Sequence, residues 1–184
     1  MKRWIPVLLF LLLPAVHADT AQLKRGLHVF KNYCSGCHAL RYMRDERLAH
    51  DLGLTRADGR TDFTHVSMPE TDARRWFGKV PPDLSLTARV RGTAWLAAYL
   101  KGFYPDFCRP FGANNRLLPM AAMPNVFAPM EHQAGLDDTI QDVVIFLEYV
   151  AEPVRLIRYR MGIGVIVFLC VLGLLLYPCR RSFE

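Results

Sequence analysis

Residues 34–38 constrain this chain more than any other stretch, because they have the pattern C-x-x-C-H. Thiols at this spacing can each form a thioether bond with one vinyl group of a haem, and the adjacent histidine then lies under the iron. A C-x-x-C pair also begins many zinc sites, but tetrahedral zinc needs a second pair of thiolates or histidines. The motif therefore predicts a covalent c-type haem on Cys34 and Cys37, with His38 as one axial ligand.

The N-terminus has the three parts of a secretory signal peptide. Lys2 and Arg3 form a basic region, residues 5–13 are apolar, and small residues precede Asp19. The apolar stretch is short for a retained membrane anchor. We expect residues 1–18 to be cleaved, so that the mature chain begins outside the cytoplasm, where c-type haem is attached.

A second apolar run closes the chain. Residues 161–177 carry no charge, and arginines flank them on both sides. At about 1.5 Å per residue the run is slightly shorter than a hydrocarbon core of roughly 30 Å, but snorkelling arginines can extend it. We predict a transmembrane anchor over 155–179, a cytoplasmic tail over 180–184 and a periplasmic domain over 19–154. The flanking arginines alone favour the opposite orientation, but the first segment usually sets the topology.

The formal net charge of +6 arises at the ends of the chain. Of the 23 basic and 17 acidic residues, the leader holds Lys2 and Arg3, and the flanks of the C-terminal run hold five arginines and Glu184. The remaining 16 basic and 16 acidic residues leave residues 19–154 formally neutral. A neutral domain without a basic stripe argues against nucleic-acid binding.

Cysteine usage is typical of a haem protein and not of a disulfide-stabilised domain. Cys34 and Cys37 are assigned to haem, Cys170 lies within the apolar run, and Cys179 lies at its end. Cys108 therefore has no partner within the exported domain. We expect it to be a buried thiol rather than an exposed reactive one.

Helical periodicity is strongest at the two ends of the exported domain. Apolar residues at i, i+4 and i+7 predict an amphipathic helix over 21–33 that runs into the haem motif. A second strong helix is expected before Pro153, with Asp137 or Asp138 as its N-terminal cap. Shorter helices are predicted over 71–77 and 93–103, and mostly irregular chain over 51–66 and 105–129.

The sixth coordination position of the iron decides the chemistry. A methionine or histidine there favours electron transfer, whereas an open face favours gas binding or peroxide chemistry. The candidate methionines are Met43, Met68, Met120, Met123 and Met130. Met123 fits best, because it lies in an irregular segment shortly before the last helix of the domain, and Met120 is the alternative. The histidines His28, His50, His65 and His132 are less favoured than either methionine.

Four stretches of the chain together indicate a family. They are C-S-G-C-H-A-L-R-Y-M over 34–43, W-F-G-K-V-P-P-D-L-S over 76–85, A-M-P-N-V over 122–126 and A-E-P-V over 151–154. In this order, before a single C-terminal span, they resemble the cytochrome c1 family in its short bacterial form. The first motif alone occurs in many cytochromes, whereas the second block combined with a C-terminal anchor is specific.

This resemblance implies a mostly α-helical fold, a class I cytochrome c-like haem domain with irregular loops and one C-terminal transmembrane helix. It implies one covalent haem c with His38 and Met123 as axial ligands. It also implies that Pro81 and Pro82 pack on the haem and that Arg91 pairs with a haem propionate. A guanidinium beside a propionate is physically reasonable, because both charges are costly to bury alone.

The function implied by the resemblance is one-electron transfer in the ubiquinol:cytochrome c oxidoreductase, the cytochrome bc1 complex of the bacterial inner membrane. The chain would accept electrons from the Rieske iron–sulfur protein, pass them to a cytochrome c, and contact cytochrome b in the membrane. It would be an electron-transfer subunit of this oxidoreductase complex, and whether the chain is an enzyme by itself stays open. The neutral domain lacks the acidic insertions of mitochondrial relatives, so the resemblance does not identify which cytochrome accepts the electron.

Two alternatives use the same haem motif. One is a membrane-anchored cytochrome c shuttle that works outside such a complex. The other is a haem peroxidase or sensor with an open distal face, which would bind carbon monoxide readily when reduced.

Overall fold

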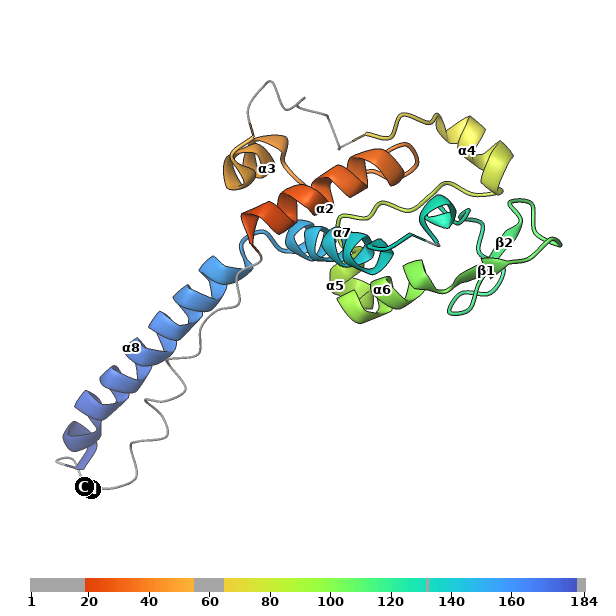
Figure 1. Cartoon of the computed structure of the whole chain (residues 1–184). Coiled ribbons are helices and arrows are strands. Elements are labelled where there is room, and N and C mark those ends of the chain that lie inside the picture. Colours follow the sequence, from red (N-terminus) through yellow and green to blue (C-terminus); the bar gives the residue numbers. More distant parts are fainter. Residues whose placement is uncertain (1–18, 55–64, 132, 182–184) are drawn as a thin grey trace. The chain divides into compact units, whose positions relative to one another are not determined.

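The computed structural model describes residues 19–54, 65–131 and 133–181, and it forms two units. The larger unit spans Ala18–Glu152, and the second contains the C-terminal helix. The signal peptide predicted for residues 1–18 lies outside the described residues. The elements of the larger unit are α2 (Thr20–Tyr33), α3 (Asp45–Leu52), α4 (Glu70–Phe77), α5 (Thr87–Arg91), α6 (Thr93–Lys101), β1 (Phe103–Pro105), β2 (Ala113–Asn115), η3 (Ala128–Met130) and α7 (Leu136–Ala151) (Figure 1).

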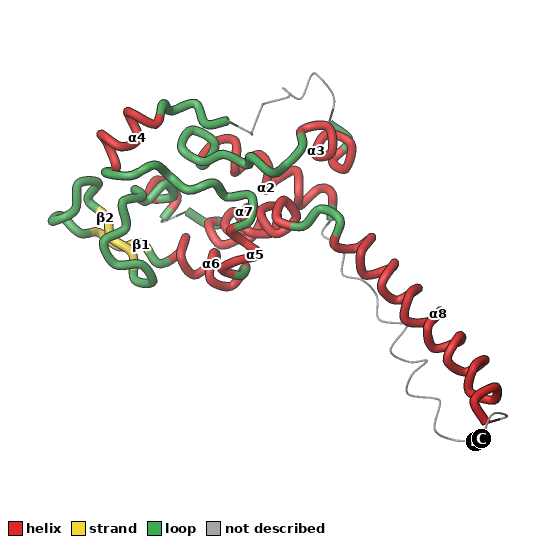
Figure 2. The backbone as a smooth tube through the Cα atoms, turned by 180° about the vertical axis from the view of Figure 1, so that it is seen from behind, coloured by secondary structure: helices red, strands yellow, loops and turns green. Residues whose placement is uncertain are grey.

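The fold is mostly α-helical, as the sequence predicted. α2, α4, α6 and α7 lie where helical periodicity placed them, and the chain between α6 and α7 is largely irregular, with one small antiparallel sheet (Figure 2). The short helices α3 and α5 were not expected. α5 has only five residues, which give too little periodicity to recognise. The segment 51–66 was expected to be a loop, but α3 extends into its first residues and ends at Leu52. Residues 55–64 of this segment lie outside the described part.

The predicted cap of α7 was wrong. The N-cap is Gly135, which has a φ of 100°, and Asp137 and Asp138 lie in the first turn instead. Glycine adopts a positive φ at little cost, which allows the chain to turn into the helix. The two carboxylates still act favourably there, because negative charge near a helix N-terminus interacts well with the helix dipole.

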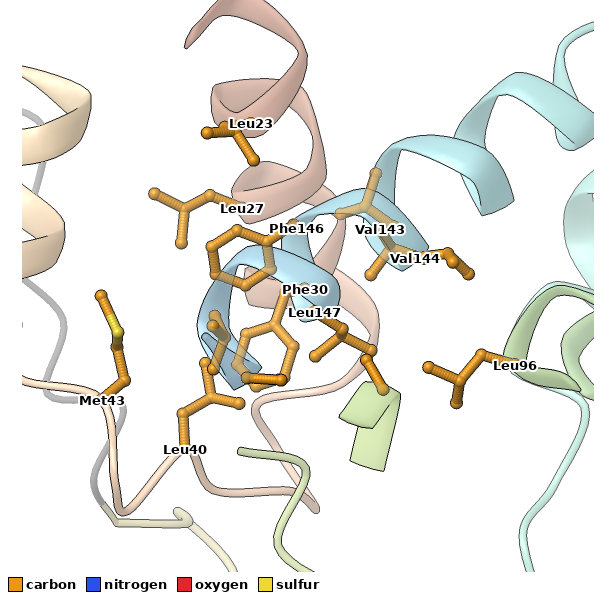
Figure 3. Packing of buried hydrophobic residues seen from close by; sticks show 14 of the residues in the cluster. Leu23, Leu27, Phe30, Leu40, Met43, Leu96, Val143, Val144, Phe146 and Leu147 are labelled. Atoms are coloured by element: carbon orange, nitrogen blue, oxygen red, sulfur yellow. The ribbon is translucent and has the colours of Figure 1, made fainter. Parts of the chain in front are cut away.

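The core of the larger unit forms where α2 crosses α7 (Figure 3). Phe30 of α2 and Phe146 of α7 are fully buried, and their ring centroids lie 5.8 Å apart. Leu40, from the loop after the haem motif, is also fully buried. Each buried side chain of this size contributes roughly 1.5–3 kcal/mol. The crossing therefore holds the haem motif, at the end of α2, firmly against α7.

Gly26 permits the close approach of these two helices. A Cβ at this position would lie 2.2 Å from the carbonyl oxygen of Asp142 and 2.6 Å from Cβ of Phe146. Next to it, Arg25 Nε donates to Asp142 Oδ2 at 2.7 Å and Arg25 Nη2 donates to Oδ1 at 3.2 Å. The ion pair thus lies beside the point where only glycine fits.

We expect Gly26→Ala to destabilise the domain by about 2–3 kcal/mol, because overpacking against backbone forces the helices apart. Intrinsic helix propensity alone would raise the free energy of unfolding by roughly 1 kcal/mol. The sign of the measured change in stability therefore tests whether the two helices are in close contact at Gly26. Denaturant unfolding of the haem-loaded domain measures it. Gly36→Ala is the control, since nothing lies within 4 Å of an added Cβ there. Equal stability of the two variants would contradict the prediction.

The second unit contains α8 (Arg155–Arg181). Residues Ile157–Leu176 have a mean hydropathy of 2.3, and none of this stretch is buried by protein. Among the described residues it is the one helix long and apolar enough to cross a membrane. A helix that exposes apolar side chains on all sides is suited to a lipid environment.

Candidate functional site

The haem motif lines a cavity of about 450 Å³ inside the larger unit. The wall is mostly apolar, and five segments far apart in sequence build it: the end of α2, the chain before α5, the α5–α6 region, the segment before η3, and α7. The lining includes Cys34, Cys37, His38, Pro81, Pro82, Arg91, Trp95, Tyr99, Met123 and Val143. Apolar cavities of this size with a few polar groups typically hold cofactors or small ligands.

The haem motif itself forms a tight turn at the end of α2. The N–H groups of Cys34 and Ser35 both donate to the carbonyl of Phe30, at 2.9 and 3.0 Å. The N–H groups of Cys37 and His38 both donate to the carbonyl of Cys34, at 3.1 and 2.8 Å. This helix-like turn brings both sulfurs and the imidazole to one cavity.

A backbone hydrogen bond orients the His38 ring. Nδ1 lies 2.7 Å from the carbonyl oxygen of Pro82, and a carbonyl only accepts, so Nδ1 carries the proton and Nε2 is left with its lone pair. Burial lowers the pKa of His38, while the bond to Pro82 and the nearby carboxylate of Asp83 act in the opposite direction. A neutral imidazole whose other nitrogen is held in this way is the usual form of a metal-ligating histidine.

Hydrogen bonds connect residues 81–85 to the chain that follows the haem motif. Asp83 accepts from the N–H of Arg41 at 2.8 Å. The fully buried Ser85 accepts from the N–H of Tyr42 through its hydroxyl oxygen at 3.1 Å. These bonds hold the Pro82 carbonyl in place for His38. Asp83 and Ser85 were not among the predicted site residues, although both belong to the P-P-D-L-S block.

Burial changes the acidity of the two thiols. It raises the pKa of Cys34 to about 12, with a further contribution from Cys37, and it also raises the pKa of Cys37. Neither side chain is a thiolate at neutral pH in this environment. Among the described residues, no group of three or more His, Cys, Asp or Glu side chains could hold a metal ion, so the pair lacks the further ligands of a tetrahedral zinc site.

The two methionines singled out by the sequence lie in different surroundings. Met123 lines the cavity with His38, and the Tyr99 hydroxyl lies 3.9 Å from its sulfur. Met120 is 70% exposed and is not among the lining residues. Of these two side chains, Met123 is therefore the one that could act as a ligand inside the cavity.

The remaining candidate ligands lie elsewhere. Met43 is buried in the hydrophobic core, and Met130 packs against that core. His28 and His50 are exposed and form hydrogen bonds with neighbouring side chains. Met68 and His65 are also absent from the cavity wall, and His132 lies outside the described residues.

Arg91 places a positive charge at the cavity wall. Its guanidinium carbon lies 5.1 Å from the centroid of the Trp95 ring. Trp95 in turn stacks on Tyr99, with centroids 5.1 Å apart and an interplanar angle of 9°. Within the described residues Arg91 forms no ion pair, so its charge is available to an anionic group of a bound cofactor.

Cys108 is exposed, which contradicts the expected buried thiol. It lies in the turn that joins β1 to β2, where its N–H donates to Asp106 Oδ1 at 3.0 Å. This part of the turn lies at the surface, where the neighbouring Phe107 is 96% exposed as well.

The cavity fits a covalent haem in its chemistry. Two uncharged sulfurs can form the thioether bonds, an oriented imidazole and a thioether sulfur can meet the iron, and a guanidinium can meet a propionate. Apolar walls suit the faces of the macrocycle. The residues brought together here are those that the sequence predicted: Cys34, Cys37, His38, Pro81, Pro82, Arg91 and Met123.

Comparisons with known proteins identify the family. The chain matches the Cytochrome C1 family over residues 13–60 and 44–183. It is 37% identical to cytochrome c1 of Allochromatium vinosum, over 90% of this chain and 84% of the relative. It is also 32% identical to a Nitrosomonas europaea protein named ammonia monooxygenase gamma subunit, over 92% of this chain and 85% of that protein.

A solved chain from a hyperthermophilic respiratory Complex III has the same fold. The TM-score is 0.54 at 23% sequence identity, over 88% of this chain and 75% of that chain. Members of the family carry a covalently bound haem c and serve respiratory electron transport. With α8 as its apolar helix, the protein is membrane-anchored. The resemblance found in the sequence is confirmed, and the chain belongs to the cytochrome c1 family.

Proposed function

We propose that this chain is the haem subunit of a quinol:cytochrome c oxidoreductase of the bc1 type. It takes single electrons from the Rieske iron–sulfur protein and passes them to a cytochrome c. The observation that carries this proposal is that His38 and Met123 line the same apolar cavity as the two cysteines. If both side chains held the iron, no coordination position would be left for a substrate, which favours electron transfer over peroxide or gas chemistry.

Different residues of the cavity would bind different parts of the haem. Cys34 and Cys37 would attach the haem, and His38 Nε2 and Met123 Sδ would hold its iron. When bound, the haem supplies reversible one-electron chemistry at its iron. The hydrogen bond from His38 to the Pro82 carbonyl keeps the imidazole in one orientation and makes Nε2 a stronger electron-pair donor to a metal.

Three further residues act on the periphery of the cofactor. Pro81 and Pro82 line the cavity and would pack against the haem. Arg91 neutralises a propionate, because an unpaired carboxylate in an apolar cavity would be costly. A low dielectric and rigid ligands both reduce the reorganisation that accompanies each electron transfer.

The chain is organised for this role at a membrane surface. Residues 1–18 are a cleaved signal peptide, 19–154 a periplasmic haem domain, 155–179 the anchor and 180–184 a cytoplasmic tail. Cytochrome b is the partner of the anchor within the inner membrane, and the Rieske protein approaches the haem domain. The acceptor is a cytochrome c, soluble or membrane-bound.

A chain that stops after Val154 tests both the anchor and the assembly. The larger unit ends at Glu152, so the truncated domain should fold, acquire haem and become soluble with an unchanged haem spectrum. It should lose cytochrome b and iron–sulfur protein on affinity purification, and with them quinol-dependent reduction of cytochrome c.

The tagged full-length chain is the control in the same native membrane. It should retain both partners in mild detergent. A full-length chain that elutes alone would favour a membrane-anchored shuttle instead. A truncated chain that still supports full quinol-dependent reduction would contradict the role of the anchor.

A further inference from the structure

The backbone of Met120 adopts an unusual conformation three residues before Met123. Its φ is 64°, and among the described residues it is the one non-glycine position with a positive φ. A side chain with a Cβ disfavours this left-handed region, so the surroundings must hold it there. Residues in such sparsely populated backbone conformations persist where the surrounding contacts fix the path of the chain.

Two side chains hold both polar groups of the Met120 backbone. Asn114 Oδ1 accepts from the Met120 N–H at 2.8 Å. Arg109 Nη2 donates to the Met120 carbonyl at 3.1 Å and to the Ala121 carbonyl at 3.4 Å. We name Asn114 and Arg109 the clamp.

The clamp residues are themselves fixed. Asn114 lies on β2, is only 8% exposed, and its Nδ2 donates to Asp106 Oδ2 at 3.0 Å. Arg109 forms no ion pair within the described residues, and its buried Nε has no hydrogen-bond partner there. The Arg109 backbone is fixed in the β1–β2 turn, where its N–H donates to the Asp106 carbonyl at 3.1 Å and its carbonyl accepts from the Gly112 N–H at 3.0 Å.

The neighbouring Asn115 ties the same segment to α6. Its Oδ1 accepts from the N–H groups of Leu117 and Leu118, at 2.9 and 3.3 Å, and its Nδ2 donates to the Tyr99 carbonyl at 2.7 Å. Tyr99 is also the residue whose hydroxyl lies beside the Met123 sulfur. The chain from β2 to Met120 is thus attached to the wall of the cavity.

We propose that Asn114 and Arg109 are positioning residues: by holding Met120 in its left-handed turn, they direct the following residues so that Met123 lies in the cavity as the sixth ligand. This inference rests on the proposed role of Met123. Without the clamp, the strained turn relaxes and the sulfur leaves the iron more often.

Imidazole binding to the ferric, haem-loaded full-length protein measures this directly. Exogenous imidazole must displace the sixth ligand, so its apparent Kd reports how firmly the protein holds Met123 in place. We expect Asn114→Ala and Arg109→Gln each to lower this Kd about tenfold, which corresponds to about 1.4 kcal/mol. The far-red sulfur-to-iron charge-transfer band of the ferric state should weaken in parallel.

Two further variants separate a clamp from general destabilisation. Tyr149→Phe removes the hydrogen bond from the Tyr149 hydroxyl to Asp51 Oδ2 at 2.7 Å, and neither residue lines the cavity, so it should lower stability without changing the imidazole Kd. Met120→Gly, added to Asn114→Ala, should recover part of the lost ligand retention, because glycine adopts a positive φ without help. Arg109→Gln keeps the test informative if Asn114→Ala does not fold.

The outcomes distinguish the clamp from the ligand assignment. Suppose that Met123→Leu abolishes the charge-transfer band but both clamp variants bind imidazole like the wild type. Met123 is then the ligand as proposed, and the positioning role of Asn114 and Arg109 is wrong. If the band survives Met123→Leu, the proposed ligand itself is wrong. An equal shift of the imidazole Kd in Tyr149→Phe, or no recovery with Met120→Gly, would also overturn the clamp.

Discussion

Replacing Cys34 and Cys37 together by serine should abolish covalent haem attachment, from about one haem per chain to none. Both thiols line the cavity next to His38, and a hydroxyl cannot form the thioether bond. The measurement is haem-dependent staining of the denatured polypeptide after electrophoresis, with the pyridine spectrum of the extracted protein as a second readout. The domain should also lose stability, because the apolar cavity would be left without the group that fills it.

Cys108→Ser is the matched control for this experiment. Cys108 is exposed in the β1–β2 turn, away from the haem motif in sequence, and is not among the residues that line the cavity. It should keep a full complement of covalent haem. Haem that leaves the wild-type chain on denaturation would end the c-type interpretation.

Met123→Leu should lower the midpoint potential on the order of 100 mV or more, within the roughly 0.8 V range that axial ligands span. A thioether favours ferrous over ferric iron, so its loss stabilises the oxidised state. The same substitution should allow carbon monoxide to bind the reduced protein, since the sixth position would be open. Redox titration and the carbon monoxide difference spectrum measure the two effects.

Met120→Leu is the control, because Met120 is exposed and outside the cavity wall. Leucine at this position leaves the backbone bonds to Asn114 and Arg109 available, so the potential should change little. A large shift in Met120→Leu together with a small one in Met123→Leu would reverse the ligand assignment. Ready carbon monoxide binding by the wild type would favour the haem enzyme or sensor.

The attachment motif could be predicted from the sequence because its chemistry is local. Cys34, Cys37 and His38 lie within five positions, and a turn at the end of α2 suffices to bring them together. The long helices could be predicted for a similar reason. Their apolar residues repeat over several turns in α2 and α7, and such repeats need a common buried face whatever they pack against.

The tertiary structure decided everything that depends on distant segments meeting. No periodicity indicates that the Pro82 carbonyl orients His38, that Gly26 permits the crossing of α2 and α7, or that Tyr99 lies beside Met123. Met120 and Met123 are close in sequence and chemically identical, yet one is exposed and the other lines the cavity. The backbone at Met120 is held by hydrogen bonds from Asn114 and Arg109 of the β1–β2 hairpin, and a one-dimensional pattern of residue types does not contain them.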